Sequence, residues 1–226
     1  MLGPNYIFLL VITLVPGLIA SWLTKSTFKK YSRVASTKGY TGAQAAAEML
    51  RSLGIADCKI ERVGGFLSDH YDPRTRTLRL SPGVHDSPSL AAIGVACHEA
   101  GHAIQHSHEY VPLKLRSLLV PATVTCSRFW MLPLIAGILM GSMQLYVAAI
   151  CMLAVAVVFT VVTLPVEWDA SSRAKIAMAD CRLLTPQENE AAGKVLNAAF
   201  LTYLAAAVSS VATLLYYLAP LLGGDD

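Results

Sequence analysis

Residues 98–102 read His98-Glu99-Ala100-Gly101-His102, and they are the most informative residues in the chain for the chemistry that we expect. Residues four apart lie on one face of an α-helix, so His98 and His102 can direct their imidazoles at one Zn²⁺ ion. Glu99 then lies beside the ion, where it can take a proton from a metal-activated water. The motif thus supplies two ligands and a general base. A metal-dependent hydrolase still needs a third ligand and an open coordination position.

The residues around the motif predict that its helix is largely buried. They are small and apolar on both sides: Ala91, Ala92, Ile93, Val95, Ala96, Ala100, Ala103 and Ile104. Ionisable groups on a buried helix need a partner, and a metal ion suits two imidazoles. Ser87 and Pro88 carry the signals that begin a helix, and we expect this one to run to about His108.

The composition indicates a mostly α-helical membrane protein. The 226 residues are 54% hydrophobic and 15% charged, with a mean hydropathy of +0.51, whereas a soluble domain has roughly 25% charged residues. Arg128 is the one charge within the apolar stretches that are long enough to cross a bilayer. We therefore expect about four transmembrane helices, at Asn5–Leu23, Leu118–Gly141, Gln144–Leu164 and Phe200–Gly224.

A basic run after the first apolar stretch predicts the orientation of the chain. It contains no acid, and a basic run beside a span marks the cytoplasmic side: Lys25, Lys29, Lys30, Arg33 and Lys38. The first stretch is then an uncleaved anchor with its N-terminus outside. A nucleic-acid partner does not fit a basic run beside a membrane span at a net charge of only +3. Five scattered cysteines without a CxxC pair are typical of a reducing compartment.

The polar segment Lys25–Pro112 is long enough for a small domain. We predict a helix at Gly42–Leu53 and a strand at Cys58–Val63, with a turn-rich stretch at Asp69–Pro73. Thr75–Leu80 alternates with period two and is predicted to be a strand with Leu78 and Leu80 on one face. An extended peptide substrate could pair with the free edge of such a strand, or the strand could serve the sheet alone.

Two kinds of residue compete for the third ligand position. His108 has the spacing of the metzincin signature, but Gln105 stands where that signature needs Gly to turn the chain back. His106 would lie about 12 Å from His98 along a straight helix, too far to share one ion. Glu167 lies beyond two predicted spans, so the chain returns to the side it left, and Pro165 can open a new helix there. We favour Glu167 as the ligand over an acid that merely ends a span.

Taken together, these motifs resemble those of the YugP-like membrane zinc peptidases, the zinc peptidase 2 family, over nearly the whole chain. The resemblance rests on residues 69–73, 80–82, 96–106 and 165–171. That family is similar to the gluzincin membrane proteases of the HtpX type. The resemblance implies a small α+β gluzincin-like cytoplasmic domain and one Zn²⁺ per chain on His98, His102 and Glu167. It also implies Glu99 as general base and acid, and a peptide or membrane-protein substrate.

One departure from the gluzincin pattern leaves the surroundings of the ligands open. Gluzincins commonly place an aspartate four residues after the glutamate ligand, where this chain has Ser171. The candidates to orient a ligand imidazole are therefore Asp169, Ser171 and an acid elsewhere in the chain. The donor that stabilises the developing oxyanion is also open, with His70, Tyr71 and Arg173 as candidates.

These observations predict five segments. They are an anchor (1–24), a cytoplasmic catalytic domain (25–112), a transmembrane hairpin (113–165), a cytoplasmic helical segment with Glu167 (166–198) and a C-terminal span with its tail (199–226). The expected function is zinc-dependent peptide hydrolysis at the cytoplasmic face of a prokaryotic plasma membrane. A zinc hydrolase acting on a non-peptide substrate and a metal-stabilised scaffold without turnover are the alternatives. The sequence leaves the oligomeric state open.

Overall fold

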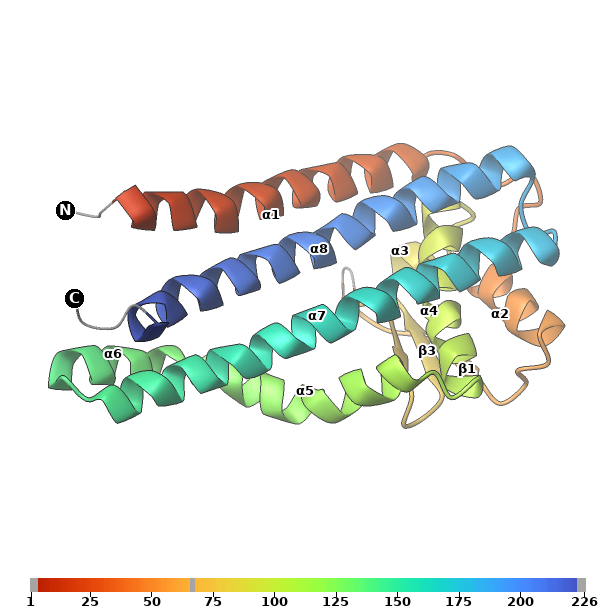
Figure 1. The fold of residues 1–226 in the computed structure, drawn as a ribbon. Coiled ribbons are helices and arrows are strands. Elements are labelled where there is room, and N and C mark those ends of the chain that lie inside the picture. Colours follow the sequence, from red (N-terminus) through yellow and green to blue (C-terminus); the bar gives the residue numbers. More distant parts are fainter. Residues whose placement is uncertain (1–3, 66–67, 223–226) are drawn as a thin grey trace.

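The computed structural model describes residues 4–65 and 68–222 as a mostly helical chain with one small sheet. Three long helices lie side by side, the sheet with the short helices α2, α3 and α4 lies at one end of them, and α6 lies at the other end (Figure 1). The helices are α1 (Pro4–Tyr31), α2 (Gly42–Ser52), α3 (Pro82–His85), α4 (Leu90–Ser107), α5 (Val111–Phe129), α6 (Met131–Met140), α7 (Met143–Asp180) and α8 (Pro186–Leu222). The strands are β1 (Lys59–Arg62), β2 (His70–Asp72) and β3 (Thr77–Leu80).

The expectation of about four membrane helices is confirmed in outline by length and composition. Helices α1, α7 and α8 are each long and apolar enough to cross a bilayer. Helices α5 and α6 form a fourth candidate span that is bent by 42° at the break between them. Arg128 lies at the end of α5, directly before this break. Residues 223–224 of the last predicted span lie outside the described residues.

The prediction that Pro165 opens a new helix is wrong. Helix α7 continues without interruption from Met143 to Asp180, with Pro165 inside it. Leaving the helix within an apolar environment would expose several backbone groups without partners, whereas a proline removes a single N–H donor. Helices α7 and α8 therefore run through residues 165 and 198, where segment boundaries were expected. Glu167 consequently lies on the same rigid helix as the apolar span.

The small domain begins with α2 as predicted. Thr41 accepts a hydrogen bond from the backbone of Gln44, whose side chain accepts one in return from the Thr41 backbone. Gly54 follows the helix with a φ of +72°, a left-handed conformation that favours glycine. These two local signals are the reason that the predicted and observed bounds of α2 agree closely.

The sheet corrects two expectations. Its strand order is β1-β3-β2, with β3 parallel to β1 and antiparallel to β2. Residues His70–Asp72, predicted to lie in a turn, form β2, and the turn follows at residues 73–76. Because β3 pairs on both sides, the Thr75–Leu80 strand has no free edge for a substrate. Leu78 and Leu80 share the core face, as their alternation predicted.

Helix α4 lies at the centre of this end of the molecule. It begins after Ser89, whose hydroxyl accepts a hydrogen bond from the backbone N–H of Ala92, and not at the predicted cap Ser87. It packs against α2, the sheet, α7 and α8. The core around it includes completely or almost completely buried side chains from four elements: Met49, Leu78, Leu80, Ile93 and Met178.

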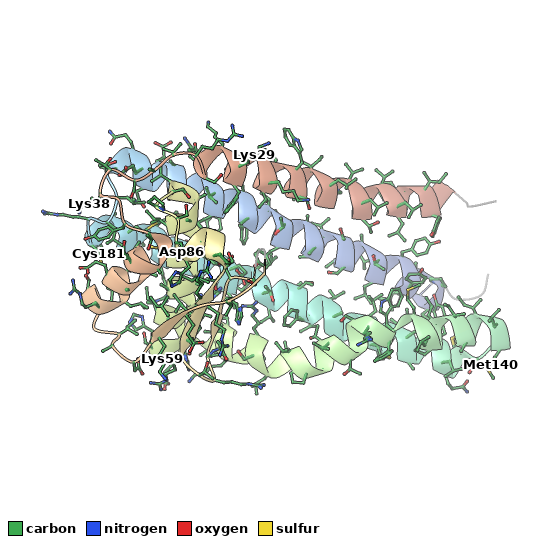
Figure 2. The ribbon with its side chains drawn as sticks, turned by 180° about the vertical axis from the view of Figure 1, so that it is seen from behind. Lys29, Lys38, Lys59, Asp86, Met140 and Cys181 are labelled. Carbon is green, nitrogen blue, oxygen red and sulfur yellow. The ribbon has the colours of Figure 1, made fainter. Side chains whose placement is uncertain are left out.

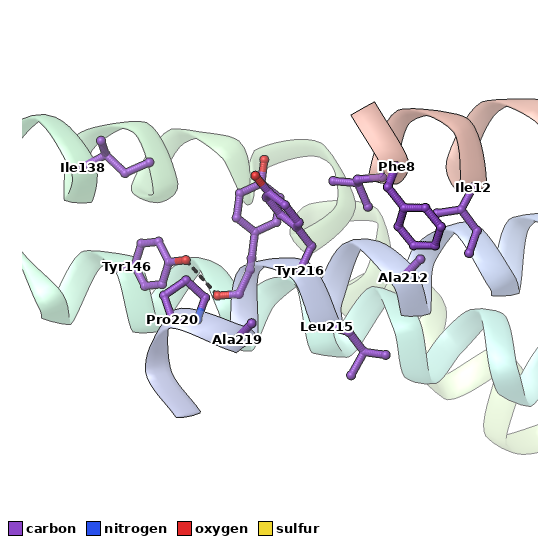
Figure 3. A pocket seen from close by; sticks show the side chains of 11 residues that line it. Phe8, Ile12, Ile138, Tyr146, Ala212, Leu215, Tyr216, Ala219 and Pro220 are labelled. Atoms are coloured by element: carbon purple, nitrogen blue, oxygen red, sulfur yellow. Dashed lines mark hydrogen bonds between the residues drawn. The ribbon is translucent and has the colours of Figure 1, made fainter. Parts of the chain in front are cut away.

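The two ends of the bundle differ in the residues they carry. Lys29, Lys38, Lys59 and Asp86 lie at the end with the sheet, and Met140 lies at the opposite end (Figure 2). At that opposite end is an apolar cavity of about 730 Å³ between α1, α6, α7 and α8. Its lining includes Phe8, Ile138 and Leu215, and the Tyr146 phenol donates a hydrogen bond of 2.7 Å to the Tyr217 carbonyl (Figure 3).

Candidate metal centre

A close approach of two helices brings the distant parts of the site together. A Cβ atom on Gly101 would lie 2.4 Å from the carbonyl oxygen of Ala170, so only glycine fits between α4 and α7 at this distance. Gly101 lies within the His-Glu motif, and Ala170 is one turn of helix after Glu167. The contact therefore sets the distance between the motif histidines and Glu167.

The structure brings His98, His102 and Glu167 into one cluster, whose candidate ligand atoms all lie within 4.8 Å of one another. Glu167 Oε2 is 3.2 Å from His98 Nε2 and 3.7 Å from His102 Nε2. Two ligands of one tetrahedral zinc ion, with bonds of about 2.0–2.1 Å, lie roughly 3.3 Å apart. The separations of Glu167 from the two histidines are close to that value, and the topological argument for Glu167 thus agrees with the geometry.

A hydrogen-bond chain determines which ring nitrogen of His102 faces the cluster. Gln105 Nε2 donates to the carbonyl of Val166 and to Asp169 Oδ2, both at 2.8 Å. The amide oxygen of Gln105 therefore faces His102 Nδ1, at 2.9 Å, and can only accept a hydrogen bond. His102 must carry its proton on Nδ1, which leaves the lone pair of Nε2 for a metal ion.

Ser171 plays the equivalent part for His98. Its hydroxyl lies 3.0 Å from His98 Nδ1, while His98 Nε2 faces Glu167. Of the candidates that the sequence left open, Ser171 thus contacts a ligand imidazole directly. Asp169 acts one step further out, because it accepts from Gln105 and from Arg173 and does not contact either histidine.

Glu167 is a buried carboxylate with each oxygen in a different environment. Its side chain is 2% exposed; Oε2 faces the histidines, and Oε1 lies 3.2 Å from Arg116 Nη1 of α5. Burial disfavours a charge on His102, but the hydrogen bond and charge of Glu167, with the charge of Glu99, outweigh burial and raise the pKa of this imidazole. The cluster therefore stabilises positive charge, as a cation site must.

Glu99 lies on the next position of α4, where the edge strand β2 holds it. The backbone N–H of Tyr71 donates a 3.0 Å hydrogen bond to Glu99 Oε2. The Tyr71 phenol lies 2.8 Å from His106 Nδ1, two turns further along α4. Burial, with smaller contributions from Cys58 and Asp72, raises the pKa of Tyr71 to about 12, so this phenol stays protonated. Tyr71 therefore ties β2 to α4 at two points.

A cavity of about 180 Å³ opens onto this cluster. One wall carries the polar residues Asp69, His98, Glu99, Glu167 and Ser171. The other wall comes mainly from α8 and is apolar apart from one phenol: Val95, Val195, Leu196, Ala199, Phe200 and Tyr203. The site thus combines a cluster of metal-ligating groups, a neighbouring carboxylate and a space for a small apolar group.

The remaining candidates lie away from this cavity. His106 contacts Tyr71, and His108 lies 2.9 Å from Arg173, so neither of these histidines belongs to the ligand cluster. His70 Nδ1 faces the carbonyl of Ser68 on an exposed surface. None of His70, Tyr71 and Arg173 is among the described residues that line the cavity.

Sequence reasoning missed three residues around the cluster. Gln105 lies three residues after His102 on the same helix face, a spacing that could have identified it. Arg116 is a charge near the start of an apolar hairpin, which is a weaker signal. Tyr203 lies in an uncharged predicted span, and no nearby residue in the sequence indicates that it belongs to the site.

Comparison with known proteins agrees with this site. A family described as "Putative neutral zinc metallopeptidase" matches residues 6–221. The "Putative membrane protease YugP" of Bacillus subtilis (strain 168) is 41% identical over 221 residues, which cover 98% of each chain. No solved structure matches. Two imidazoles and a carboxylate are a ligand set that zinc accepts, and both imidazoles direct Nε2 toward the carboxylate. The chain therefore belongs to this family of zinc metallopeptidases.

Proposed function

We propose that this protein is a membrane-embedded zinc endopeptidase that cleaves peptides or membrane proteins at the cytoplasmic face of a prokaryotic plasma membrane. The observation that carries the proposal is the cluster of His98, His102 and Glu167 beside Glu99 and a cavity. Residues 25–112 would act as a gluzincin-type catalytic domain. One Zn²⁺ per chain is proposed to bind at the cluster.

The proposed reaction assigns a role to each group. Zinc bound by the three ligands would act as a Lewis acid that acidifies water and polarises the peptide carbonyl. Glu99 takes a proton from the attacking water as its oxygen bonds to the carbonyl carbon. The C–N bond then breaks, and Glu99 returns the proton to the leaving amine. Gln105 holds His102 in its ligating tautomer, and Ser171 orients the ring of His98 through Nδ1.

The edge strand supports a peptide as the substrate. Strand β2 is at the end of the sheet order, so one of its sides is unpaired within the sheet. That side faces α4, because the Tyr71 backbone N–H reaches Glu99. An extended peptide placed along β2 would have its backbone beside Glu99 and a side chain in the cavity.

The distribution of basic residues supports the proposed orientation. Lys29, in the last turn of α1, and Lys38, which follows that helix, lie at the same end of the bundle as the sheet (Figure 2). By the positive-inside rule this end faces the cytoplasm. The bilayer would then surround α1, α7, α8 and the α5–α6 pair.

The test uses purified full-length protein with zinc and four variants. We expect one zinc per wild-type chain and hydrolysis of casein but not of lipid substrates. His98→Ala and Glu167→Ala should lose the metal. Glu99→Gln should keep the metal and lose hydrolysis by about 1,000-fold or more, because the general base is gone. Glu109→Gln, at an exposed position just after the motif helix, is the matched control and should behave as wild type.

Two results would contradict the proposal. Wild-type protein that binds zinc without hydrolysing peptides would favour the scaffold alternative. Hydrolysis that survives Glu99→Gln would show that another group acts as the base.

A further inference from the structure

We propose that Tyr203 of α8 is a catalytic residue whose phenol donates a hydrogen bond to the oxyanion formed from the peptide carbonyl. This inference rests on the proposed function, since it concerns the reaction at the same cavity. It assigns the role for which the sequence offered only His70, Tyr71 and Arg173.

The position of Tyr203 is the first support. It lines the cavity together with His98, Glu99 and Glu167, although it lies on a different helix from all three. The charges of Glu167, Glu99 and Arg116 act on its phenol, so the phenol lies near the cluster. A carbonyl attacked at this cluster would therefore have the phenol beside it.

The inventory of donors in the cavity is the second support. Among the eleven described residues that line it, three have side-chain donors when the carboxyl groups are ionised, namely His98, Ser171 and Tyr203. His98 and Ser171 are bonded to each other through Nδ1 and Oγ. The phenol remains as the donor available to a substrate.

The three residues suggested by the sequence are committed elsewhere. The Tyr71 phenol is bonded to His106, and the Arg173 guanidinium lies against Asp169 and His108. His70 faces the Ser68 carbonyl. Moving any of them to the cavity would require breaking a contact that the structure contains, whereas Tyr203 is already there.

In the proposed step, the water oxygen bonds to the carbonyl carbon and the electron pair of the C=O bond moves to the oxygen. The Tyr203 O–H donates to that oxygen without transferring its proton. The proton lost by water resides on Glu99 until the C–N bond breaks. The phenol thus acts only where negative charge develops, which is the condition for raising kcat.

The experiment compares wild type with Tyr203→Phe, which keeps the ring and removes only the hydroxyl. We expect kcat to fall by about 100- to 1,000-fold, KM to change less than threefold and zinc to remain at one per chain. A phosphinic peptide, whose anionic oxygens mimic the tetrahedral oxyanion, should bind the zinc-loaded variant more weakly by about the same factor as kcat falls. The matched control is Tyr146→Phe, which removes a phenol at the far end of the bundle. It should leave all four measurements unchanged.

Three outcomes would overturn the assignment. Unchanged kcat or unchanged phosphinate affinity in Tyr203→Phe would remove the oxyanion role. Loss of zinc would show that Tyr203 only supports Glu167. If wild-type protein hydrolyses no peptide, the proposed function fails, and phosphinate binding to the zinc-loaded protein still tests Tyr203 by itself.

Discussion

The two ends of α7 use the same packing device for different purposes. At one end Gly101 of α4 approaches the backbone of Ala170, and at the other Gly137 of α6 approaches the backbone of Tyr146. At both, an added Cβ would lie less than 3.0 Å from a backbone atom. Only the first contact holds a network of buried charges and imidazoles. The second packs beside an apolar cavity that is about four times larger (730 against 180 Å³).

This difference shows that cavity size does not identify the end of the molecule that contains the candidate metal site. The larger cavity offers apolar surface and a few tyrosines, which suits contact with lipid or packing. The smaller one contains Glu167, a carboxylate with a side chain only 2% exposed. Burying a carboxylate costs free energy that its partners must offset. A buried carboxylate grouped with two imidazoles and an arginine therefore indicates a functional site.

Among the variants that compare the two ends of α7, the largest effect is expected from breaking the close approach itself. Gly101→Ala should force α4 and α7 apart, displace Glu167 and lower hydrolysis by about 100-fold, with loss of zinc. Both substitutions should lower the free energy of unfolding by about 1–3 kcal/mol. Gly137→Ala is the matched control, because it should do so without changing the zinc content. Zinc analysis, hydrolysis rates and thermal unfolding in detergent provide the measurements. Wild-type zinc content and rate in Gly101→Ala would remove the distinction between the two ends.

An intermediate effect is expected from the amide that orients His102. Gln105→Leu leaves His102 Nδ1 and Asp169 without their buried partner, so zinc affinity should fall by about 10- to 100-fold. Competition with a chromophoric chelator measures it. Gln187→Leu, at an exposed position near the start of α8, should have no effect. A zinc affinity of Gln105→Leu within twofold of wild type would mean that the contact with Gln105 does not affect zinc binding by His102.

The smallest effect is expected from Arg116, at the outer limit of the network. Its side chain is 28% exposed, so solvent screens its interaction with Glu167. Arg116→Gln should lower zinc affinity by about tenfold, or roughly 1.4 kcal/mol, and Arg116→Lys should restore part of the loss. Lys114→Gln is the control, because Lys114 pairs with an exposed Glu109 and should contribute nothing measurable to zinc binding. Equal zinc affinities in the Arg116→Gln and Lys114→Gln variants would show that Arg116 does not contribute to zinc binding.

Much of the fold followed from local patterns in the sequence. The apolar stretches, the cap of α2 at Thr41 and Gly54, and the alternation of Leu78 and Leu80 each depend on residues close together in the chain. The errors came where a local signal met a stronger tertiary one. Pro165 is a helix-opening residue by preference, but the apolar surroundings of α7 favour an unbroken helix. The Asp69–Pro73 stretch contains turn residues, but pairing with β3 makes its centre a strand.

The sequence alone predicted that two histidines share one face of a helix, with Glu99 beside them, because residues four apart lie on one face of the α-helix. It also predicted that Glu167 returns to the side of the membrane that the chain left after the histidines, because two expected spans lie between them. Only the tertiary structure decided which side chains surround these groups. Gln105 shares a helix with the histidines but works through Val166 and Asp169 of α7, while Arg116 and Tyr203 come from α5 and α8. No periodic pattern links those elements. The contact between α4 and α7 forms because Gly101 lets the two helix backbones meet.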